Sequence, residues 1–249
     1  MRSLVIDSQA EIGTGETWND PPRVVDYKFE TLWERSAEAG IDRSCVSVPR
    51  NPTYGSANQA LAKLCEKHPE QLIGFAVHSP MRETGQIRQM LIEEVKSMGL
   101  KGVRCDGHPT RELLDAAAEL EIPVIYYPDP RDIPGGPLPA YFMPASAYPS
   151  VRFIMPHLGS YRTQVWWAPI AAIDVAKRFP NVYLGTSGCI SVKYLEMAAR
   201  ELPPEKLLFG SSAPELDPRV EIQAVKLLKL EGSAQDFVLG GNVRRLLGL

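Results

Sequence analysis

The 249-residue chain is 44% hydrophobic and 23% charged, with a formal net charge of -3 at pH 7. No linker, repeat or low-complexity tract interrupts it, so we expect one globular domain over residues 1–249. The slight negative charge argues against nucleic acid and anionic membranes as partners. No apolar run approaches the ~20 residues of a membrane span.

Four cysteines, Cys45, Cys65, Cys105 and Cys189, are widely spaced and form no CxxC motif. Neither a zinc ribbon nor a disulfide framework is therefore predicted. The first residues, MRSLVIDSQAEIG, become acidic and polar too early for a signal peptide. We expect a cytoplasmic protein with reduced thiols.

Apolar runs that favour strands alternate with amphipathic segments that favour helices along the whole chain. The predicted strands are Leu4–Ile12, Asp42–Pro49, Gln71–Val77, Gly99–Cys105, Pro123–Tyr127, the run from Val151, Val182–Ser187 and Lys206–Gly210. The predicted helices are Phe29–Gly40, a segment capped by Asn58 that ends near Lys67, Thr84–Met98, Thr110–Leu120, Ala168–Phe179, Val192–Glu201, Arg219–Leu230 and a short C-terminal helix. Eight strands alternating with helices predict an α/β fold, a single-domain (β/α)8 TIM barrel.

The first predicted strand becomes polar towards its end, LVIDSQAEI. In an unbroken strand its odd positions, from Val5 to Glu11, share one face, and this polar row suits a site better than a core. A doubly wound open sheet is the alternative fold, but that fold usually carries a glycine-rich phosphate turn where this chain has DSQAEIG. Residues 13–28 are rich in Gly, Asn, Asp and Pro and are predicted to be a loop.

The segment Val151–Ser160, VRFIMPHLGS, is an apolar run that breaks at Pro156. Because side chains alternate along a strand, residues 153, 155 and 157 are expected on one inward face. His157 then lies at the C-terminal end of a buried parallel strand, where (β/α)8 barrels place their chemistry. A structural histidine in a strand-end turn is the alternative.

Other strand ends also carry polar side chains, and we expect them to ring one barrel mouth. The residues are Gln9, Glu11, His78, Arg104, Asp106 and Tyr127, with His108 in a following loop. Glu11 and His157 are candidates for acid–base catalysis, and Tyr127 for donation to a developing oxyanion. Arg104 is a candidate for bidentate binding of a substrate carboxylate; a structural ion pair with Asp106 or Glu11 is the alternative.

Several motifs together resemble the amidohydrolase-related family, the branch that includes aminocarboxymuconate-semialdehyde decarboxylase and small lactonases. They are IDSQAEIG, GLKGVR, PHLGS, LLFGSSAP and GGNVRRLLGL, and the resemblance extends over nearly the whole chain. The resemblance implies a TIM barrel with its site at the C-terminal strand ends.

The chain departs from this family at the metal-ligand positions. Where metal-binding members have His-x-His after the first strand, this chain has Gln9 and Glu11. The family's strand-five histidine corresponds to Tyr127 and its strand-eight aspartate to Ser212, while the strand-six histidine is kept as His157. Because Gln, Tyr and Ser are poor zinc ligands, we expect no zinc and no other cofactor.

The resulting expectation is a metal-independent hydrolase or lyase that acts on a small, carboxylate-bearing organic substrate. Its catalytic residues would be His157, Glu11 and Tyr127, and its substrate-binding residues would be Gln9, His78, Arg104, Asp106 and Ser212. Two alternatives stay open. One is an inactive barrel that serves as a binding or scaffold protein. The other is a metalloenzyme whose ligands are rebuilt from Glu11, His78, Asp106, His108 or His157.

The aromatic pair Trp166–Trp167 follows the central strand. It is open to three interpretations: packing over the site, core packing, or a subunit contact in a homodimer.

Overall fold

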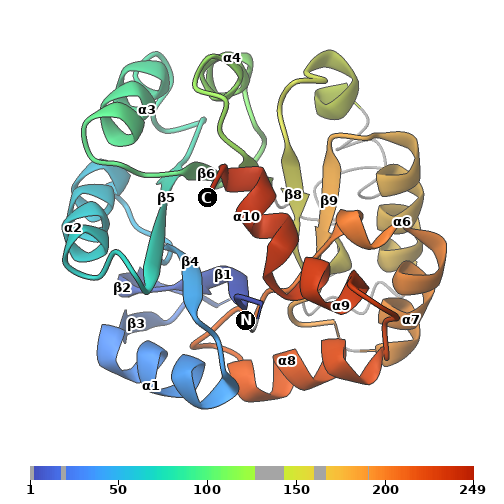
Figure 1. Cartoon of the computed structure of the whole chain (residues 1–249). Coiled ribbons are helices and arrows are strands. Elements are labelled where there is room, and N and C mark those ends of the chain that lie inside the picture. The colour runs from blue at the N-terminus through green and yellow to red at the C-terminus, as the bar shows by residue number, and fades with distance from the viewer. Residues whose placement is uncertain (1–2, 18–20, 127–142, 160–166, 190) are drawn as a thin grey trace.

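The computed structural model describes the chain except residues 1–2, 18–20, 127–142, 160–166 and 190. Eight parallel strands follow one another around the sheet in chain order (Figure 1). They are β1 (Ile6–Glu11), β4 (Arg43–Ser47), β5 (Leu72–His78), β6 (Gly102–Cys105), β7 (Val124–Tyr126), β8 (Phe153–Met155), β9 (Val182–Gly185) and β10 (Leu207–Leu208). The amides of Ser8 and Ser212 donate to the carbonyls of Phe209 and Gln9, each at 2.8 Å, and join the first strand to the last. The predicted (β/α)8 TIM barrel is confirmed.

Helices surround the strands (Figure 1). They are α1 (Phe29–Ala39), α2 (Tyr54–Lys67), α3 (Ile87–Lys96), α4 (Arg111–Glu119), α6 (Ala168–Arg178), α7 (Val192–Glu201) and α8 (Pro218–Leu227). After the short α9 (Ala234–Asp236), the terminal helix α10 (Asn242–Leu247) lies across the N-terminal end of the barrel. Its Val243 and Leu246 pack against Ile6, whose side chain points into the barrel. Because α10 covers this end of the barrel, a site must open at the opposite end. Within the described ranges, no helix is long and apolar enough to cross a membrane.

Residues 13–28 are not entirely loop, as the sequence had suggested. Two short strands, β2 (Gly13–Glu16) and β3 (Val24–Tyr27), form an antiparallel hairpin. The amide of Glu16 donates to the carbonyl of Arg50 at 2.7 Å, and a Cβ at Gly15 would lie 2.6 Å from that same oxygen. This close backbone approach is a tertiary contact that local propensity cannot reveal.

Strand side chains divide into an inner and an outer core. Phe75, Ile125 and Ile154 meet inside the barrel, whereas Val103 and Val124 pack outside it with helix residues. Both sets are almost fully buried, which is the normal condition of a parallel sheet covered by helices.

A β-bulge in β1 reverses this inside–outside pattern. Asp7 pairs with Ser44 and Ala10 with Val46, so two residues of β1 lie opposite one residue of β4. Ile6, before the bulge, packs inside the barrel, whereas Ala10 and Ile12, after it, pack in the outer core. The odd positions therefore do not share one face as expected. The extra residue turns Gln9 and Glu11 inward, in line with the role of bulges in redirecting side chains near sites.

The predicted inward row of β8 is also wrong. Phe153 and Met155 belong to the outer core, and Ile154 is the inward residue. His157 departs from the strand period because it and Leu158 adopt left-handed conformations, with φ of 58° and 47°. Such conformations cost roughly 1–3 kcal/mol each in non-glycine residues, so surrounding contacts must hold them.

Asn58 is not the helix cap that the sequence had suggested, because it lies in the second turn of α2. Its side chain is fully buried and binds the backbone of β5: Nδ2 donates to the Val77 carbonyl and Oδ1 accepts from the Val77 amide, each at 3.0 Å. Nδ2 also donates to Glu94 Oε1 at 2.8 Å. Asn58 thus connects α2, β5 and α3.

Replacing Asn58 by alanine should lower the free energy of unfolding by about 2–4 kcal/mol, because it leaves buried backbone groups of Val77 unsatisfied. Urea denaturation followed by circular dichroism measures the loss. Gln59→Ala, at the exposed neighbouring position, is the control and should change stability by less than about 0.5 kcal/mol. Equal effects of the two substitutions would contradict the assigned role of Asn58.

Candidate active site at the barrel mouth

Arg104 and Glu11 form an ion pair inside the barrel. Arg104 Nη1 donates to Glu11 Oε1 at 2.5 Å and to Ser47 Oγ at 3.3 Å. The two charged side chains are only 7% and 10% exposed. Of the two roles considered for Arg104, the structure shows the ion pair with Glu11. A buried ion pair requires good geometry to offset the desolvation of its two charges. This pair lies inside the barrel, at the C-terminal ends of β1 and β6.

His157 takes part in a ring of hydrogen bonds with Gln9 and Ser187. Its Nδ1 lies 2.9 Å from the carbonyl of Ser187, which can only accept, so Nδ1 carries the proton. In the neutral ring Nε2 is then the acceptor, and Gln9 Nε2 lies 3.3 Å from it. Ser187 Oγ donates to Gln9 Oε1 at 3.2 Å and closes the ring. The network therefore selects one tautomer, in which Nε2 is the basic atom.

Ser212 lies directly beside Gln9. Its amide donates to the Gln9 carbonyl at 2.8 Å, and its φ of 55° is left-handed. The residue is 7% exposed, and Oγ has no hydrogen-bond partner in the described part of the chain. Buried hydroxyls are normally satisfied, so this oxygen marks a position for a water or a ligand.

Asp7 supports the same corner of the barrel. The amide of Ser211 donates to Asp7 Oδ1 at 2.9 Å, the Ser211 hydroxyl donates to Oδ2, and the Gln9 amide donates to Oδ1. Burial raises the pKa of the Asp7 carboxyl to about 7, although these hydrogen bonds lower it. Asp7 connects β1 to the turn after β10 and so fixes the backbone that carries Gln9 and Ser212.

Three candidates have their partners elsewhere. His78 is completely buried between Glu83, in the loop before α3, and Glu94, on α3. The Asp106 carboxylate accepts from Tyr54 Oη and Arg82 Nη2, and His108 is hydrogen-bonded to Tyr126.

Tyr127 and Trp166 lie outside the described residues, while Trp167 is 36% exposed and precedes α6. The structure thus brings Gln9, Glu11, Arg104, His157 and Ser212 to one barrel end but gives His78 and Asp106 structural partners instead.

Sequence reasoning missed Ser47, Ser187 and Asp7. Ser47 ends β4, and Ser187 follows β9 by two residues. Both are polar residues at the end of a buried strand, and this same signal identified Glu11 and Arg104. Asp7 was part of the polar row in β1 but gave no indication of its link to Ser211.

A closed barrel with charged and polar side chains at one end is typical of a TIM-barrel enzyme. Residues 21–249 match the family model described as "Amidohydrolase", and the chain belongs to this family. No curated protein matches the chain.

Several solved structures share the fold at low sequence identity. A dihydroxybenzoic acid decarboxylase from Polaromonas, with manganese and 2-nitroresorcinol bound, is 18% identical with a TM-score of 0.75, over 100% of this chain and 98% of that chain. A 5-carboxyvanillate decarboxylase from Novosphingobium aromaticivorans, complexed with manganese and a nitrobenzoic acid, is 14% identical with a TM-score of 0.74, over 99% and 96%. A probable 2-pyrone-4,6-dicarboxylic acid hydrolase from Acinetobacter baumannii, with citric acid bound, is 18% identical with a TM-score of 0.73, over 98% and 99%.

The expectation of no cofactor is wrong in the light of these neighbours, because two of them hold manganese. The residues described for this chain do not by themselves fit such an ion. Across those ranges, no three His, Cys, Asp or Glu side chains are grouped for a metal, and the rebuilt ligand set suggested by the sequence does not assemble there. Among the described residues, Glu11 and His157 are ligand-type side chains that face the mouth, and the cationic Arg104 lies against the Glu11 carboxylate.

The network around His78 predicts a pH-dependent stability. Burial alone disfavours the imidazolium, but the hydrogen bonds and charges of Glu83 and Glu94 outweigh it and raise the pKa of His78 to about 9. The protonated form of His78 therefore stabilises the folded state. This contribution is complete below the ordinary histidine pKa of about 6.5 and is lost as the pH rises through about 9.

We therefore expect the free energy of unfolding to fall by about 3 kcal/mol over this pH range through His78. Denaturation midpoints measured from pH 6 to pH 10 test this, and His78→Gln should flatten the profile. His68→Gln, a change at the end of α2, is the control and should keep the wild-type slope. An unchanged slope in His78→Gln would refute the assignment.

The ion pair at the mouth predicts how manganese acts on stability. Arg104→Met should destabilise the fold by about 3–5 kcal/mol, because it leaves a buried carboxylate without its cation. Manganese should then raise the melting temperature of Arg104→Met more than that of the wild type, since carboxylate oxygens are ligands for this ion.

The double variant Arg104→Met/Glu11→Gln should lose that extra stabilisation, and Arg104→Lys, which keeps the positive charge, is the matched control. Equal manganese effects on wild type and Arg104→Met would show that Arg104 does not control metal access to Glu11.

Proposed function

We propose that the chain is an enzyme that cleaves a small, carboxylate-bearing organic molecule at the C-terminal mouth of the barrel, as a decarboxylase or a hydrolase. The observation that carries this proposal is the convergence of Gln9, Glu11, Arg104, His157 and Ser212 on that end of the barrel, with each side chain at least nine-tenths buried. Two of them, Gln9 and His157, reach the interior through a bulge and a left-handed turn. Such departures from regular geometry are frequent at functional sites.

Substrate binding is assigned to Arg104, Ser212 and Gln9. The guanidinium of Arg104 is a planar donor that matches a carboxylate, and Ser47 holds one of its nitrogens in place. The Ser212 hydroxyl, buried without a described partner, is in position to bind a polar group of the substrate. An anionic substrate would compete with Glu11 for Arg104, so Glu11 is available as a base only when the substrate has bound.

Proton transfer is assigned to His157. Decarboxylation needs a proton delivered to the carbon that loses carbon dioxide, and hydrolysis needs one removed from water. An imidazole serves either purpose near neutral pH. The bond from Nδ1 to the Ser187 carbonyl orients the ring, so that Nε2 removes the proton from water in hydrolysis. In decarboxylation Nε2 first takes up a proton from solvent water and then delivers it to the carbon that loses carbon dioxide.

The structural neighbours support the choice of substrate class. Among them are decarboxylases named for dihydroxybenzoic acid and 5-carboxyvanillate and a hydrolase named for 2-pyrone-4,6-dicarboxylic acid. Each named compound is a ring that carries a carboxylate. The described residues of this chain form no site for the manganese that two of these neighbours hold.

The direct test is incubation of the purified protein with 2,6-dihydroxybenzoate, 5-carboxyvanillate and 2-pyrone-4,6-dicarboxylate, each with and without added manganese. Loss of the substrate's ultraviolet absorbance and release of carbon dioxide distinguish hydrolysis from decarboxylation. Turnover of at least one compound is expected. If none is turned over and none shifts the melting temperature, the proposal is lost and a scaffold role for the barrel is favoured.

His157→Asn should lower kcat on the active substrate by about 10²–10⁴-fold, the usual contribution of a general acid or base, while leaving the fold intact. Activity and the melting temperature are measured together. His68→Asn makes the same exchange far from the mouth and should leave kcat unchanged. Full activity in His157→Asn would assign proton transfer to another group, and an unfolded His157→Asn protein would make His157 structural.

A further inference from the structure

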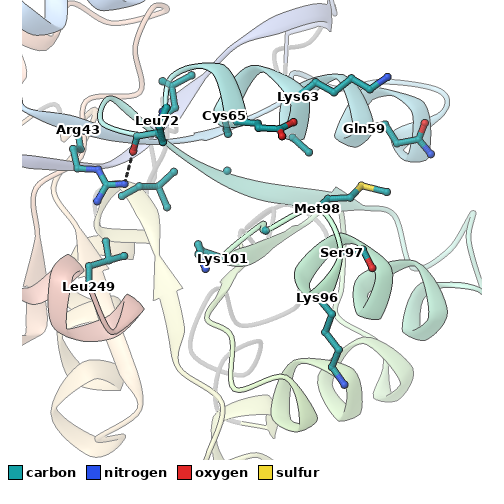
Figure 2. Close-up of a pocket in the computed structure, with 16 residues that line it drawn as sticks. Arg43, Gln59, Lys63, Cys65, Leu72, Lys96, Ser97, Met98, Lys101 and Leu249 are labelled. Atoms are coloured by element: carbon teal, nitrogen blue, oxygen red, sulfur yellow. Dashed lines mark hydrogen bonds between the residues drawn. The ribbon is translucent and has the colours of Figure 1, made fainter.

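A pocket of about 620 Å³ lies at the end of the barrel opposite the mouth. It opens between α2 and α3 at the starts of β5 and β6, near Leu72 and Lys101 (Figure 2). Because parallel strands all run in the same direction, these starts lie at the N-terminal end of the barrel. The pocket is therefore separate from the proposed active site, and its volume is in the range of small-molecule sites.

Glycine shapes the floor of this pocket. A Cβ at Gly74 would lie 2.4 Å from Leu100 Cδ2 and 3.0 Å from Cys65 Sγ, so a larger residue there would displace these side chains. Gly99 adopts a φ of 76°, which lets the chain turn from α3 into β6. Besides charged side chains, the lining includes small and aliphatic residues such as Ala62, Leu72 and Ile73.

The charged side chains of the lining are predominantly basic. Arg43, Lys63, Lys96 and Lys101 line the pocket together with a single acidic residue, Glu66. None of these four cations forms an ion pair with a described residue, although the chain as a whole carries a net charge of -3. Four cations against one carboxylate side chain thus concentrate positive charge in a concave site, a feature typical of anion binding.

Arg43 supplies a second, independent observation. Its Nη2 donates to the Pro69 carbonyl at 2.8 Å, which holds the guanidinium in the pocket wall (Figure 2). Its Nε is buried and has no hydrogen-bond partner in the described part of the chain. Leaving a buried donor unsatisfied costs about 1–3 kcal/mol, and a shift of the guanidinium towards a bound anion would remove that cost.

We propose that this pocket binds a small molecule with two or more negative charges, either phosphorylated or polycarboxylated. Arg43 and Lys101 come from strand starts, and Lys63 and Lys96 from the flanking helices (Figure 2). One exposed ion pair contributes little, so several separated cations favour a ligand that engages more than one of them. The lysine side chains are long and flexible enough to turn toward such a ligand.

Isothermal titration calorimetry with two probes, pyrophosphate and tricarballylate, tests this proposal and separates phosphate from carboxylate recognition. At least one probe should bind, and added sodium chloride should weaken the binding. Lys101→Gln and Lys96→Gln should each weaken it by about three- to tenfold, as expected for loss of one charged contact. Lys193→Gln, at an exposed lysine on α7, is the matched control and should have no effect.

Three results would overturn the proposal: neither probe binds at millimolar concentration, neither pocket variant weakens binding, or Lys193→Gln weakens it equally. The last result would show general attraction to surface lysines. Arg43→Met adds a measure of the buried donor, and its melting temperature shows whether loss of the Pro69 contact has disturbed the fold.

Discussion

The hydrogen-bonded ring of Gln9, His157 and Ser187 is the interaction on which the mouth depends. It joins side chains from three parts of the barrel, β1, the turn after β8 and the segment after β9. Each of the three residues makes hydrogen bonds with the other two, in a buried position where a polar group without a hydrogen bond would destabilise the fold. It also determines which nitrogen of His157 is basic, so the same contacts that stabilise the barrel end prepare the proposed chemistry.

Two local irregularities make this ring possible. The bulge in β1 changes the side to which the following residues point, and the left-handed turn at His157 moves it out of the alternation of β8. Both irregularities lower the stability of the local backbone, and contacts in the surrounding structure must offset this loss. The link between Asp7 and Ser211 is one such compensation, because it fastens β1 to the turn that carries Ser212.

The alternation of apolar runs was enough to predict the barrel, since its strands and helices are separated by clear breaks. It was not enough to decide which face of each strand is the inner one, because both faces of a covered parallel sheet are apolar. The strand period was therefore a wrong reason for expecting His157 at the mouth, as Phe153 and Met155 face outward. His78 was misplaced because nothing local reveals Glu83 and Glu94 as its partners. The correspondence with family ligand positions located Gln9 and Ser212 but led to a wrong expectation about metal.

The protonation state of His157 is the most direct test of the proposed chemistry at the barrel mouth. In protein labelled with ¹⁵N at histidine, long-range proton–nitrogen correlation spectra at neutral pH distinguish the tautomers of its four histidines. We predict that His157 carries its proton on Nδ1 and that Nε2 is unprotonated, with a changed Nε2 signal when a carboxylate ligand binds. A protonated Nε2 with a bare Nδ1, or a signal indifferent to the ligand, would contradict it.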